Sequence, residues 1–490
     1  MSESLKNGAI SGAKWNTFFS FSQYFFTFIL SIILASLLEP AEFGLVGMLS
    51  IFIAIAQVFI DSGLSTAIIR NKNTTTEDYS TVFWFNISVS TLFYLLLFFS
   101  APLIAKFYKE PQLIILTRLT CLVFVINSFG IVQNAIFVKN FKFKIQSFCN
   151  LSGLIVSIFV GIVMAYKGYG VYSIVGQILS QAILKNLMLW LLSEWKPEFA
   201  FYKNSFKKLW KFGSNILLVQ LITSVIDNFD NMLIAKVFST SKLGYFMRAK
   251  STKQIPEQIF SGVINVITFT VLSKINDQLE EFRRLHLKFF NLTVYGVVPI
   301  AFGIVATAHP LIVILYTVKW LISVPYLQII GFAIIPYLLS FVFSQTIMAY
   351  GDSKLYLKLN TIKKILGLFS IPFGIFFNIK AFLIVTVLIS NLGLILDIYF
   401  TSRLLNHKLN LYIKKMLLPI FIGSIMLITS LISFKIPVQS LFLKLVFQII
   451  TGILVYISLS IVFKIQEFYI YLNIAKEQYN NFINRFKKHK

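Results

Sequence analysis

Residues 33–45 read ILASLLEPAEFGL, and residues 233–245 read LIAKVFSTSKLGY. In each segment an alanine is followed, after eight intervening residues, by a glycine, and the two segments lie 200 residues apart. A weaker echo pairs QNA at 133–135 with QTIMA at 345–349. Because the echoes fall at corresponding points along the chain, they predict a protein built from two similar halves, related by an axis along the membrane normal.

Apolar stretches long enough to cross a bilayer recur along the whole chain. Of its 490 residues, 57% are hydrophobic and 13% are charged, whereas about a quarter of the residues in a soluble domain are charged. About 20 apolar residues span the hydrocarbon core, and their backbone must satisfy its own hydrogen bonds there. The sequence therefore predicts an all-α, polytopic membrane protein. We expect about fourteen spans, at 15–38, 43–66, 81–105, 114–137, 148–166, 169–192, 209–237, 249–272, 288–316, 323–350, 355–378, 380–405, 412–435 and 440–463.

The spans and the repeat together predict the domain organisation. We expect two pseudo-symmetric six-helix bundles, followed by two peripheral helices. The final segment is basic and rich in aromatic residues, which is typical of a tail that lies along the anionic inner leaflet or is simply solvated. The expected bounds are 1–205 and 206–408 for the bundles, 409–463 for the peripheral helices and 464–490 for a cytoplasmic tail.

The loops between the spans alternate in charge. Loops after even-numbered spans carry most of the Lys and Arg, and loops after odd-numbered spans carry few. By the positive-inside rule this alternation places both termini in the cytoplasm. One connection, between the seventh and eighth spans, breaks the pattern. Either the spans are wrongly assigned at this connection, or its cations line a cavity rather than a loop. These cations are Lys242, Arg248, Lys250 and Lys253.

Several other functions are disfavoured by composition. The net charge of +25 does not indicate nucleic-acid binding, because the cations lie mostly in short loops, where topology and anionic lipid require them. The first apolar run is too long for a cleavable signal peptide. Cys121 and Cys149 are expected to be buried and unpaired. The four His residues lack metal-ligand spacing and no G-x-x-x-x-G-K-[ST] loop is found, so we expect no metal, no catalytic residue and no direct use of ATP.

Five of the expected helices carry a continuous polar side, which a helix facing lipid does not need. Their polar residues recur at steps of three, four or seven, and this spacing places them on one side of a helix. The five stripes are Asn16, Ser20, Gln23, Thr27 and Ser31; Gln57, Asp61 and Ser65; Thr117, Thr120, Asn127 and Asn134; Gln220, Ser224, Asp227 and Asn231; and Lys250, Gln254, Glu257, Ser261, Asn265 and Thr268.

Two explanations of these stripes are open. Ser, Thr, Asn and Gln often hold membrane helices together by hydrogen bonds. Charged residues on or beside the stripes favour instead a water-filled central cavity, because each costs about 2.5–3.5 kcal/mol at mid-bilayer on insertion scales. Pro256 should kink the eighth span, either as a hinge or as a static bend. The polar lining that we predict is Asn16, Gln23, Gln57, Asn127, Gln220, Gln254 and Asn265.

The predicted cavity holds charges of both signs. Arg binds a phosphate or diphosphate in a bidentate manner and Lys binds it as a point charge. Acids in such a cavity couple transport to an H⁺ or Na⁺ gradient, or else they pair with the bases, as Glu257 does if it meets Lys253 or Lys250. Asp397 is an acid without an explanation. The candidate head-group residues are Arg118, Arg248, Lys250 and Lys253, and the candidate coupling acids are Asp61, Asp227, Asp230 and Glu257.

Six segments carry a resemblance to a known family. They read DSGLSTAIIR at 61–70, TVFWFN at 81–86, APLIAKFY at 101–108, QNAIFVKNFKFK at 133–144, DNMLIAKVFSTSKLGYFMRAK at 230–250 and LYTVKW at 315–320. With these segments the chain resembles Wzx-type flippases and polysaccharide exporters, in the colanic-acid-exporter-like branch of the multidrug/oligosaccharidyl-lipid/polysaccharide superfamily. The resemblance covers roughly residues 10–400. Thr317 stands where that family has Gly, which puts the geometry of one loop in doubt.

The resemblance implies a monomer of twelve to fourteen helices in two bundles, working by alternating access in the bacterial inner membrane. It implies an undecaprenyl-diphosphate-linked sugar repeat as the substrate, and a glycan polymerase or other assembly proteins as partners. Arg70 and Arg248 lie inside matched segments, so they are the first candidates for residues that contact the diphosphate head group. No cofactor beyond a coupling H⁺ or Na⁺ is expected.

Three other functions compete with this interpretation. A multidrug or toxin antiporter of the same superfamily would carry a small cation, and acids would dominate its cavity, whereas here bases at least match acids. A membrane glycosyltransferase or glycan polymerase would need a large hydrophilic loop or a cluster of catalytic acids, whereas the loops here are short. A channel would need a repeated filter-like segment, and no such segment is found in the sequence.

Overall fold

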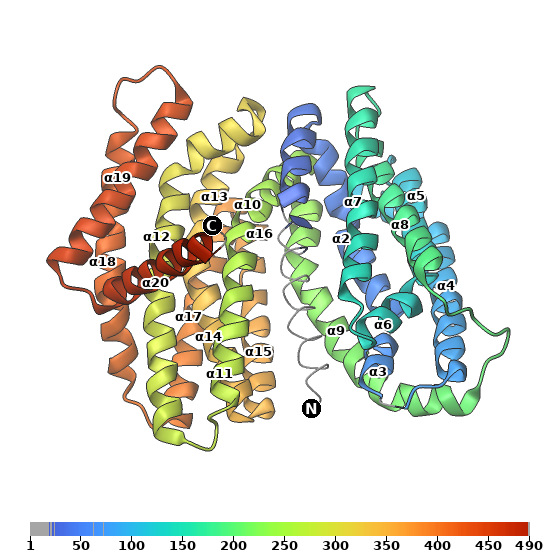
Figure 1. Cartoon of the computed structure of the whole chain (residues 1–490). Coiled ribbons are helices and arrows are strands. Elements are labelled where there is room, and N and C mark those ends of the chain that lie inside the picture. The colour runs from blue at the N-terminus through green and yellow to red at the C-terminus, as the bar shows by residue number, and fades with distance from the viewer. Residues whose placement is uncertain (1–18, 20–21, 24, 62, 72, 489–490) are drawn as a thin grey trace. The chain divides into compact units, whose positions relative to one another are not determined.

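The computed structural model describes residues 19, 22–23, 25–61, 63–71 and 73–488, which form helices and connections and no strand (Figure 1). The chain divides into two compact units, Met1–Met247 and Arg248–Lys490. Helix α10 (Thr240–Ile264) begins in the first unit and continues into the second. The predicted boundary at 205/206 separates the two repeated halves, whereas the two units of the structure are defined by compactness. The predicted boundary therefore stays a prediction.

The first unit consists of helices that pack in pairs. α7 packs along α8, α4 along α5, and α2 along α9. The short helices α3 and α6 lie against each other and against α4. The helices are α2 (Pro40–Asp61), α3 (Leu64–Arg70), α4 (Thr76–Tyr108), α5 (Leu113–Ser128), α6 (Ile131–Lys139), α7 (Phe143–Tyr166), α8 (Tyr172–Leu192) and α9 (Lys203–Val237).

The start of α4 anchors one end of this unit. Thr75 and Asp78 form a capping box, in which each side chain accepts a hydrogen bond from the backbone N–H of the other, so two of the unpaired donors at the helix start are satisfied. Asp78 also binds Lys208 of α9, with Nζ 3.2 Å from Oδ2. The backbone N–H of Glu198 donates to Ser80 Oγ at 3.0 Å. These contacts fasten the connection before α9 to the start of α4.

The fourth predicted span is a broken helix. α5 and α6 meet at an angle of 45°. Beside the break, Asn186 of α8 donates from Nδ2 to Asn127 Oδ1 at 3.2 Å and to the carbonyl of Ala182 at 2.7 Å. Polar side chains at the break therefore bind a neighbouring helix, as Asn residues of membrane helices often do.

The second unit is organised around its longest helix. Phe290, Val294, Val298 and Phe302 recur every four residues along α12 and are all buried. This stripe packs against α14, α18 and α19. After α10 the helices are a π-helical turn (Asn265–Phe269), α11 (Thr270–Ser273), α12 (Leu279–Tyr316), a 3₁₀ turn (Val318–Trp320), α13 (Ser323–Gly331), α14 (Ile334–Tyr350), α15 (Ser353–Leu368), α16 (Ile371–Phe376), α17 (Ile379–Leu404), α18 (Leu409–Ser433), α19 (Leu441–Val462) and α20 (Gln466–Lys488).

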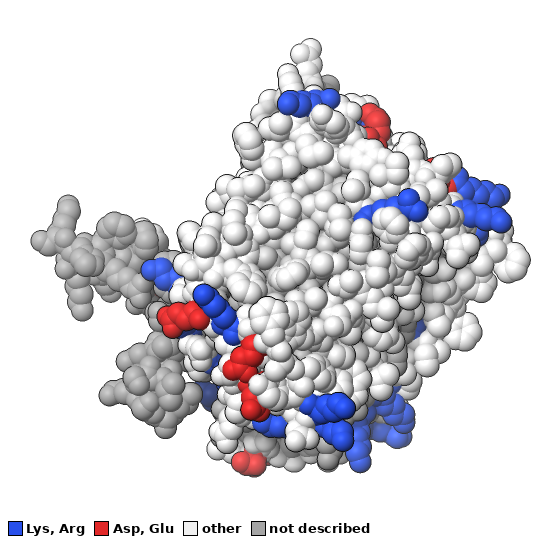
Figure 2. All heavy atoms as spheres, turned by 90° about the vertical axis from the view of Figure 1, so that its right-hand side faces the viewer, with Lys and Arg blue, Asp and Glu red and all other residues white. Residues whose placement is uncertain are grey.

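The predicted membrane spans agree with the helices. Among the described residues, eleven helices are long and apolar enough to cross a membrane, and α5 with α6 makes a twelfth. The first predicted span reaches beyond the described residues, which retain an apolar helix at Phe25–Leu37. The seventh corresponds to α9, of 35 residues. The face of the first unit seen in Figure 2 is mostly uncharged, with Lys and Arg towards its margins, as expected for a lipid-facing surface. The all-α, polytopic fold is confirmed.

The predicted tail forms helix α20, which crosses α12 in Figure 1. Tyr471 donates from Oη to the carbonyl of Leu292 in α12 at 3.1 Å. Phe468 packs against the core around α12. The first turns of this segment are therefore attached to the second unit rather than freely solvated.

A buried hydrogen-bond chain joins α12, α14 and the start of α18. Thr346 Oγ1 donates to the carbonyl of Val342 at 2.9 Å, so it accepts from Nδ1–H of His286, also at 2.9 Å. The Nε2 of His286 is then the acceptor for the hydroxyl of Tyr412 at 3.0 Å. The Tyr412 oxygen in turn accepts from Nδ1–H of His407 at 2.9 Å. The chain has one direction, and its order requires His286 to be neutral.

We predict that this network makes the fold less stable in acid. Burial, and then the charge of Arg283, lower the pKa of His407 below its ordinary value of 6.5, although Glu280 opposes the shift. The unfolded chain therefore binds the proton more readily, so this contribution to stability is present above about pH 6.5 and is lost as the pH falls below it.

The measurement is the thermal unfolding temperature of the purified protein in detergent. It should fall between about pH 7.5 and about pH 5.5, and a His407→Asn variant should show a shallower fall. Parallel curves for the two proteins would contradict the prediction.

Candidate functional site

The repeated segments meet at a helix crossing within the first unit. α2 begins at Pro40 and α10 at Thr240. A Cβ atom on Gly44 would overlap the backbone oxygen of Thr240, and a Cβ atom on Gly244 would overlap the backbone oxygen of Pro40. Residues 200 positions apart thus exchange the same contact, as two copies related by a two-fold axis would. The glycines let two helix starts touch backbone to backbone.

We predict that Gly44→Ala and Gly244→Ala each separate the two helix starts. The obstructing atoms belong to backbone, which cannot rotate away, so each variant should lose about 1–3 kcal/mol of stability by overpacking. The thermal unfolding temperature measures this. Gly262→Ala is the matched control, because a Cβ atom there meets nothing within 4 Å. A Gly44→Ala protein as stable as Gly262→Ala would show that the crossing is looser than described.

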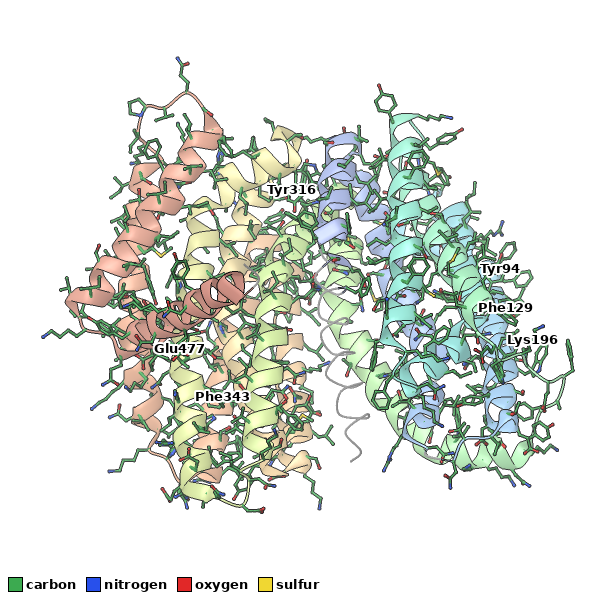
Figure 3. All side chains as sticks on the ribbon, in the orientation of Figure 1. Tyr94, Phe129, Lys196, Tyr316, Phe343 and Glu477 are labelled. Atoms are coloured by element: carbon green, nitrogen blue, oxygen red, sulfur yellow. The ribbon has the colours of Figure 1, made fainter. Side chains whose placement is uncertain are left out.

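Arg248, in the eighth span, is enclosed by aromatic rings of the second unit. Its Cζ atom lies 4.6 Å from the ring centroid of Tyr316 and 4.9 Å from that of Trp320. The residue is only 4% exposed. Cation–π contact of this kind contributes about 2 kcal/mol or more where water is excluded. Tyr316, labelled in Figure 3, lies at the end of α12 that leads into the LYTVKW segment.

The loop that carries these rings is strained at Thr317. This residue has φ 77° and ψ 171°, a region that is almost restricted to Gly. The turn is held by hydrogen bonds from the Thr317 N–H to Val313 O and from the Trp320 N–H to Thr317 O. The replacement of the family's Gly by Thr317, which put the geometry of this loop in doubt, therefore has a physical consequence. The chain keeps the geometry that suits glycine and places a β-branched residue in it.

We predict that Thr317→Gly stabilises the protein. Strain of this kind costs about 1–3 kcal/mol, and a glycine loses about 0.4–1 kcal/mol of that gain through unfolded-state entropy, so the net gain is about 1 kcal/mol. The thermal unfolding temperature should rise for Thr317→Gly and not for Thr317→Ala, which keeps a Cβ atom. An equal rise in both would argue against strain at this position.

Further along α10 a lysine neutralises the predicted coupling acid Glu257. Lys253 Nζ lies 2.8 Å from Glu257 Oε1, and both side chains are largely buried. The ammonium also lies 5.8 Å from the ring centroid of Tyr337 on α14. This is the pairing that the i,i+4 spacing allows. The assignment of Glu257 to ion coupling stays a prediction.

The helix continues past the predicted hinge. α10 runs through Pro256 to Ile264, and the helical regularity changes only at the π-helical turn Asn265–Phe269. Such turns often mark functional positions in long helices. Lys250 is half-buried, and Gln254 and Asn265 are exposed.

The other predicted head-group cations lie in the first unit. Arg118 on α5 stacks on Phe98 of α4, with Cζ 4.3 Å from the ring centroid, and its Nε donates to the Phe98 carbonyl at 3.4 Å. Arg70 is exposed at the last position of α3. Both remain candidates for a phosphate-binding role.

The amides of the stripes divide into two groups. Several bind neighbouring helices: Asn127 pairs with Asn186, Asn134 accepts from Gln146 at 3.0 Å, and Asn231 donates to Ser50 at 3.0 Å. For these residues the explanation by helix-holding hydrogen bonds applies. Others are exposed or half-buried and remain candidate lining, namely Gln23, Gln57 and Gln220.

Some predicted residues lie outside what the structure describes. Asn16 falls outside the described residues altogether. Asp61 and Asp227 belong to described helices, but the structure does not describe their side chains. Asp230 is half-buried on α9. Sequence reasoning missed Lys363 on α15, which binds Asp397 on α17; the residues lie in different helices, so no spacing rule reveals the pair.

A comparison with known families decides the class of the protein. Residues 33–325, more than half of the chain, match the family described as polysaccharide biosynthesis protein. The chain belongs to this polysaccharide biosynthesis family. The resemblance found in the sequence is thereby confirmed.

Relatives of this polysaccharide biosynthesis protein include two with named pathways. It is 25% identical over 335 residues to the teichuronic acid biosynthesis protein TuaB of Bacillus subtilis, covering 67% of this chain and 68% of the relative. It is 22% identical over 332 residues to the lipopolysaccharide biosynthesis protein WzxC of Escherichia coli, covering 67% of each. A membrane protein encoded in the cps region of Klebsiella pneumoniae is 24% identical over 381 residues, covering 76% and 78%.

Solved structures share the fold of this family member. The lipid II flippase MurJ in an inward closed conformation superposes with a TM-score of 0.74 at 17% identity, over 91% of this chain and 98% of MurJ. A multidrug resistance transporter of the MATE family, inward-facing, gives 0.63 at 15% identity, over 78% and 94%. The MATE transporter is a member of the MOP superfamily, and this chain shares its fold.

Proposed function

We propose that the protein is a flippase that moves a lipid-linked, diphosphate-bearing glycan repeat unit across the bacterial inner membrane by alternating access. The observation that carries this proposal is the family match over residues 33–325, in a chain with the fold of a lipid II flippase. The names of two relatives, which refer to teichuronic acid and lipopolysaccharide biosynthesis, support a glycan-containing substrate. Such a head group cannot cross about 30 Å of hydrocarbon unaided, because each unpartnered polar group costs several kcal/mol.

The charges inside the spans support an anionic substrate. Each of the three buried acids with described side chains, Asp78, Glu257 and Asp397, already binds a lysine. The rival multidrug antiporter would need carboxylates to receive a small cation, and here the buried carboxylates that the structure describes are each paired with a lysine. Arg118 stacks on the ring of Phe98 and Arg248 on that of Tyr316, and a guanidinium held in this way retains the positive charge that a phosphate ligand requires.

The remaining features of the proposal follow from charge placement and family. The alternating loop charges favour a cytoplasmic location of both termini. A monomer suffices for alternating access between two repeats. The flipped glycan is a substrate for a polymerase or another assembly protein on the far side of the membrane. The energy source is an H⁺ or Na⁺ gradient.

We predict that Arg248→Ala and Arg70→Ala abolish flipping of a fluorescent polyprenyl-diphosphate-linked oligosaccharide in proteoliposomes. Arg binds a diphosphate through paired, charge-assisted hydrogen bonds. Arg248→Lys keeps the charge but loses one such bond, worth about 1.5–3 kcal/mol, so its rate should fall by about tenfold or more. The readout is the fraction of probe protected from an external reagent.

Arg403→Ala serves as the control. Arg403 also stacks on a ring, with Cζ 4.7 Å from the Tyr399 centroid, but it lies outside the matched family segments. Its flipping rate should stay at the wild-type level. Wild-type flipping in both Arg70→Ala and Arg248→Ala would remove the head-group assignment. A wild-type protein that exports small organic cations but does not flip the probe would favour the antiporter.

A further inference from the structure

A buried ion pair outside the predicted site joins two helices of the second unit. Lys363 Nζ on α15 lies 3.0 Å from Oδ1 and 2.9 Å from Oδ2 of Asp397 on α17, so one ammonium occupies both carboxylate oxygens. The Asp397 side chain is 1% exposed and that of Lys363 is 18% exposed. Both residues lie within apolar spans, where charges are costly and usually functional.

The surroundings are shaped to hold this pair. The aliphatic stem of Lys363 packs against Gly393 on α17, where an added Cβ atom would come within 3.1 Å of it. Ser340 of α14 hydrogen-bonds the carboxylate from a third helix. The neighbouring helices α13, α14 and α16 contain no charged residue. On α18, Lys414 and Lys415 are exposed.

The other charges near the pair belong to the helices that form it. α15 carries three further lysines, and α17 carries an exposed Arg403 near its end. Lys363 is the charged group that acts on the Asp397 carboxylate. The charge of this one carboxylate therefore depends on one ammonium and on whatever enters between them.

The pair also holds a helix that is otherwise weakly attached. Leu359 is the buried side chain of α15, and only 17% of the most apolar part of the span Ser353–Phe376 is buried. Apolar burial normally holds helices of this length in place, so here much of the attachment of α15 to α17 rests on the ion pair. Removing the carboxylate charge would loosen α15.

We propose that Asp397 is the acid that takes up the coupling ion, that this ion is a proton, and that Lys363 is its built-in counter-cation. The inference rests on the proposed flippase function and names the ion and its residue. Protonation forms one O–H bond on the carboxylate, converts Asp397 to a neutral acid, and leaves the Lys363 ammonium charged and free to move with α15. Loss of that proton on the other side of the membrane restores the pair.

A proton fits this site better than Na⁺ does. A metal ion on the carboxylate would sit beside an ammonium that already contacts both oxygens, and two cations at such a distance repel strongly where water is scarce. A proton instead removes the negative charge by forming a covalent bond, so it competes with the ammonium directly. Among the described residues no group of three or more His, Cys, Asp or Glu is placed to hold a metal.

The test uses the full-length protein in proteoliposomes with the fluorescent polyprenyl-diphosphate-linked oligosaccharide as probe. Flipping is measured with and without a pH gradient at zero membrane potential, and separately with a Na⁺ gradient. The wild type should respond to the pH gradient only. In Asp397→Asn the ratio of rates with and without the pH gradient should fall to about one, because coupling requires a titratable group.

Two further variants separate coupling from simple helix attachment. Lys363→Met keeps the apolar stem, and the double variant Lys363→Met with Asp397→Asn leaves no unpaired charge, so it should fold. A merely structural pair predicts that the double variant regains the wild-type pH response, whereas our proposal predicts that it stays insensitive. Lys208→Met removes the cation of another Lys–Asp pair, at the start of α4, and should leave the response unchanged.

A readout independent of flipping completes the test. Infrared difference spectra on acidification of the reconstituted protein should contain a protonated-carboxyl band that is missing in Asp397→Asn. Absence of that band in the wild type, or a wild-type pH response in Asp397→Asn, would overturn the inference, as would stimulation by Na⁺. A wild type that shows the band but does not flip the probe would instead count against the proposed flippase function.

Discussion

Hydrocarbon offers no hydrogen bonds and little dielectric screening, so each charge within a span must be matched by a group that the protein supplies. This requirement accounts for the contacts made by the intramembrane cations. Lys253 and Lys363 reach carboxylates on the same or a neighbouring helix. Arg248 contacts the rings of two aromatic residues. Lys253, Lys363 and Arg248 are thus each held by a group on the same helix or on a neighbouring segment.

The same requirement separates the roles of the two signs. The negative charge of a carboxylate bound to an ammonium is neutralised until a proton or another cation displaces the ammonium. A guanidinium held by rings keeps its full charge and exchanges one soft contact for another when an anion arrives. A transporter of anionic glycans needs the second property at its substrate site and the first at its coupling site. Glu257 and Asp397 on one side, and Arg248 on the other, fit this division.

Much of the fold was predictable because its strongest determinants are local. A run of about 20 apolar residues predicts a span wherever it occurs, and the expected spans agree with the described helices from α2 to α19. The pairing of Lys253 with Glu257 was within reach of an i,i+4 rule. The partners of Arg248 and of Lys363 were not, because they lie on other helices; Lys363 and Asp397 are separated by 34 positions. Periodicity identifies the polar side of a helix, but it does not say which helix that side meets. For the same reason Asn127 was assigned to a wet lining, although it binds Asn186 of α8.

The crossing of α2 and α10 has a consequence for which amino-acid changes the two repeated segments tolerate. Each glycine at the crossing faces the main chain of the other segment. No substitution in that segment can make its backbone atoms smaller. A change in the opposing segment therefore cannot make room for a larger residue at Gly44 or at Gly244. Two sites 200 positions apart are therefore coupled, because a larger residue at either one displaces the backbone of the other segment.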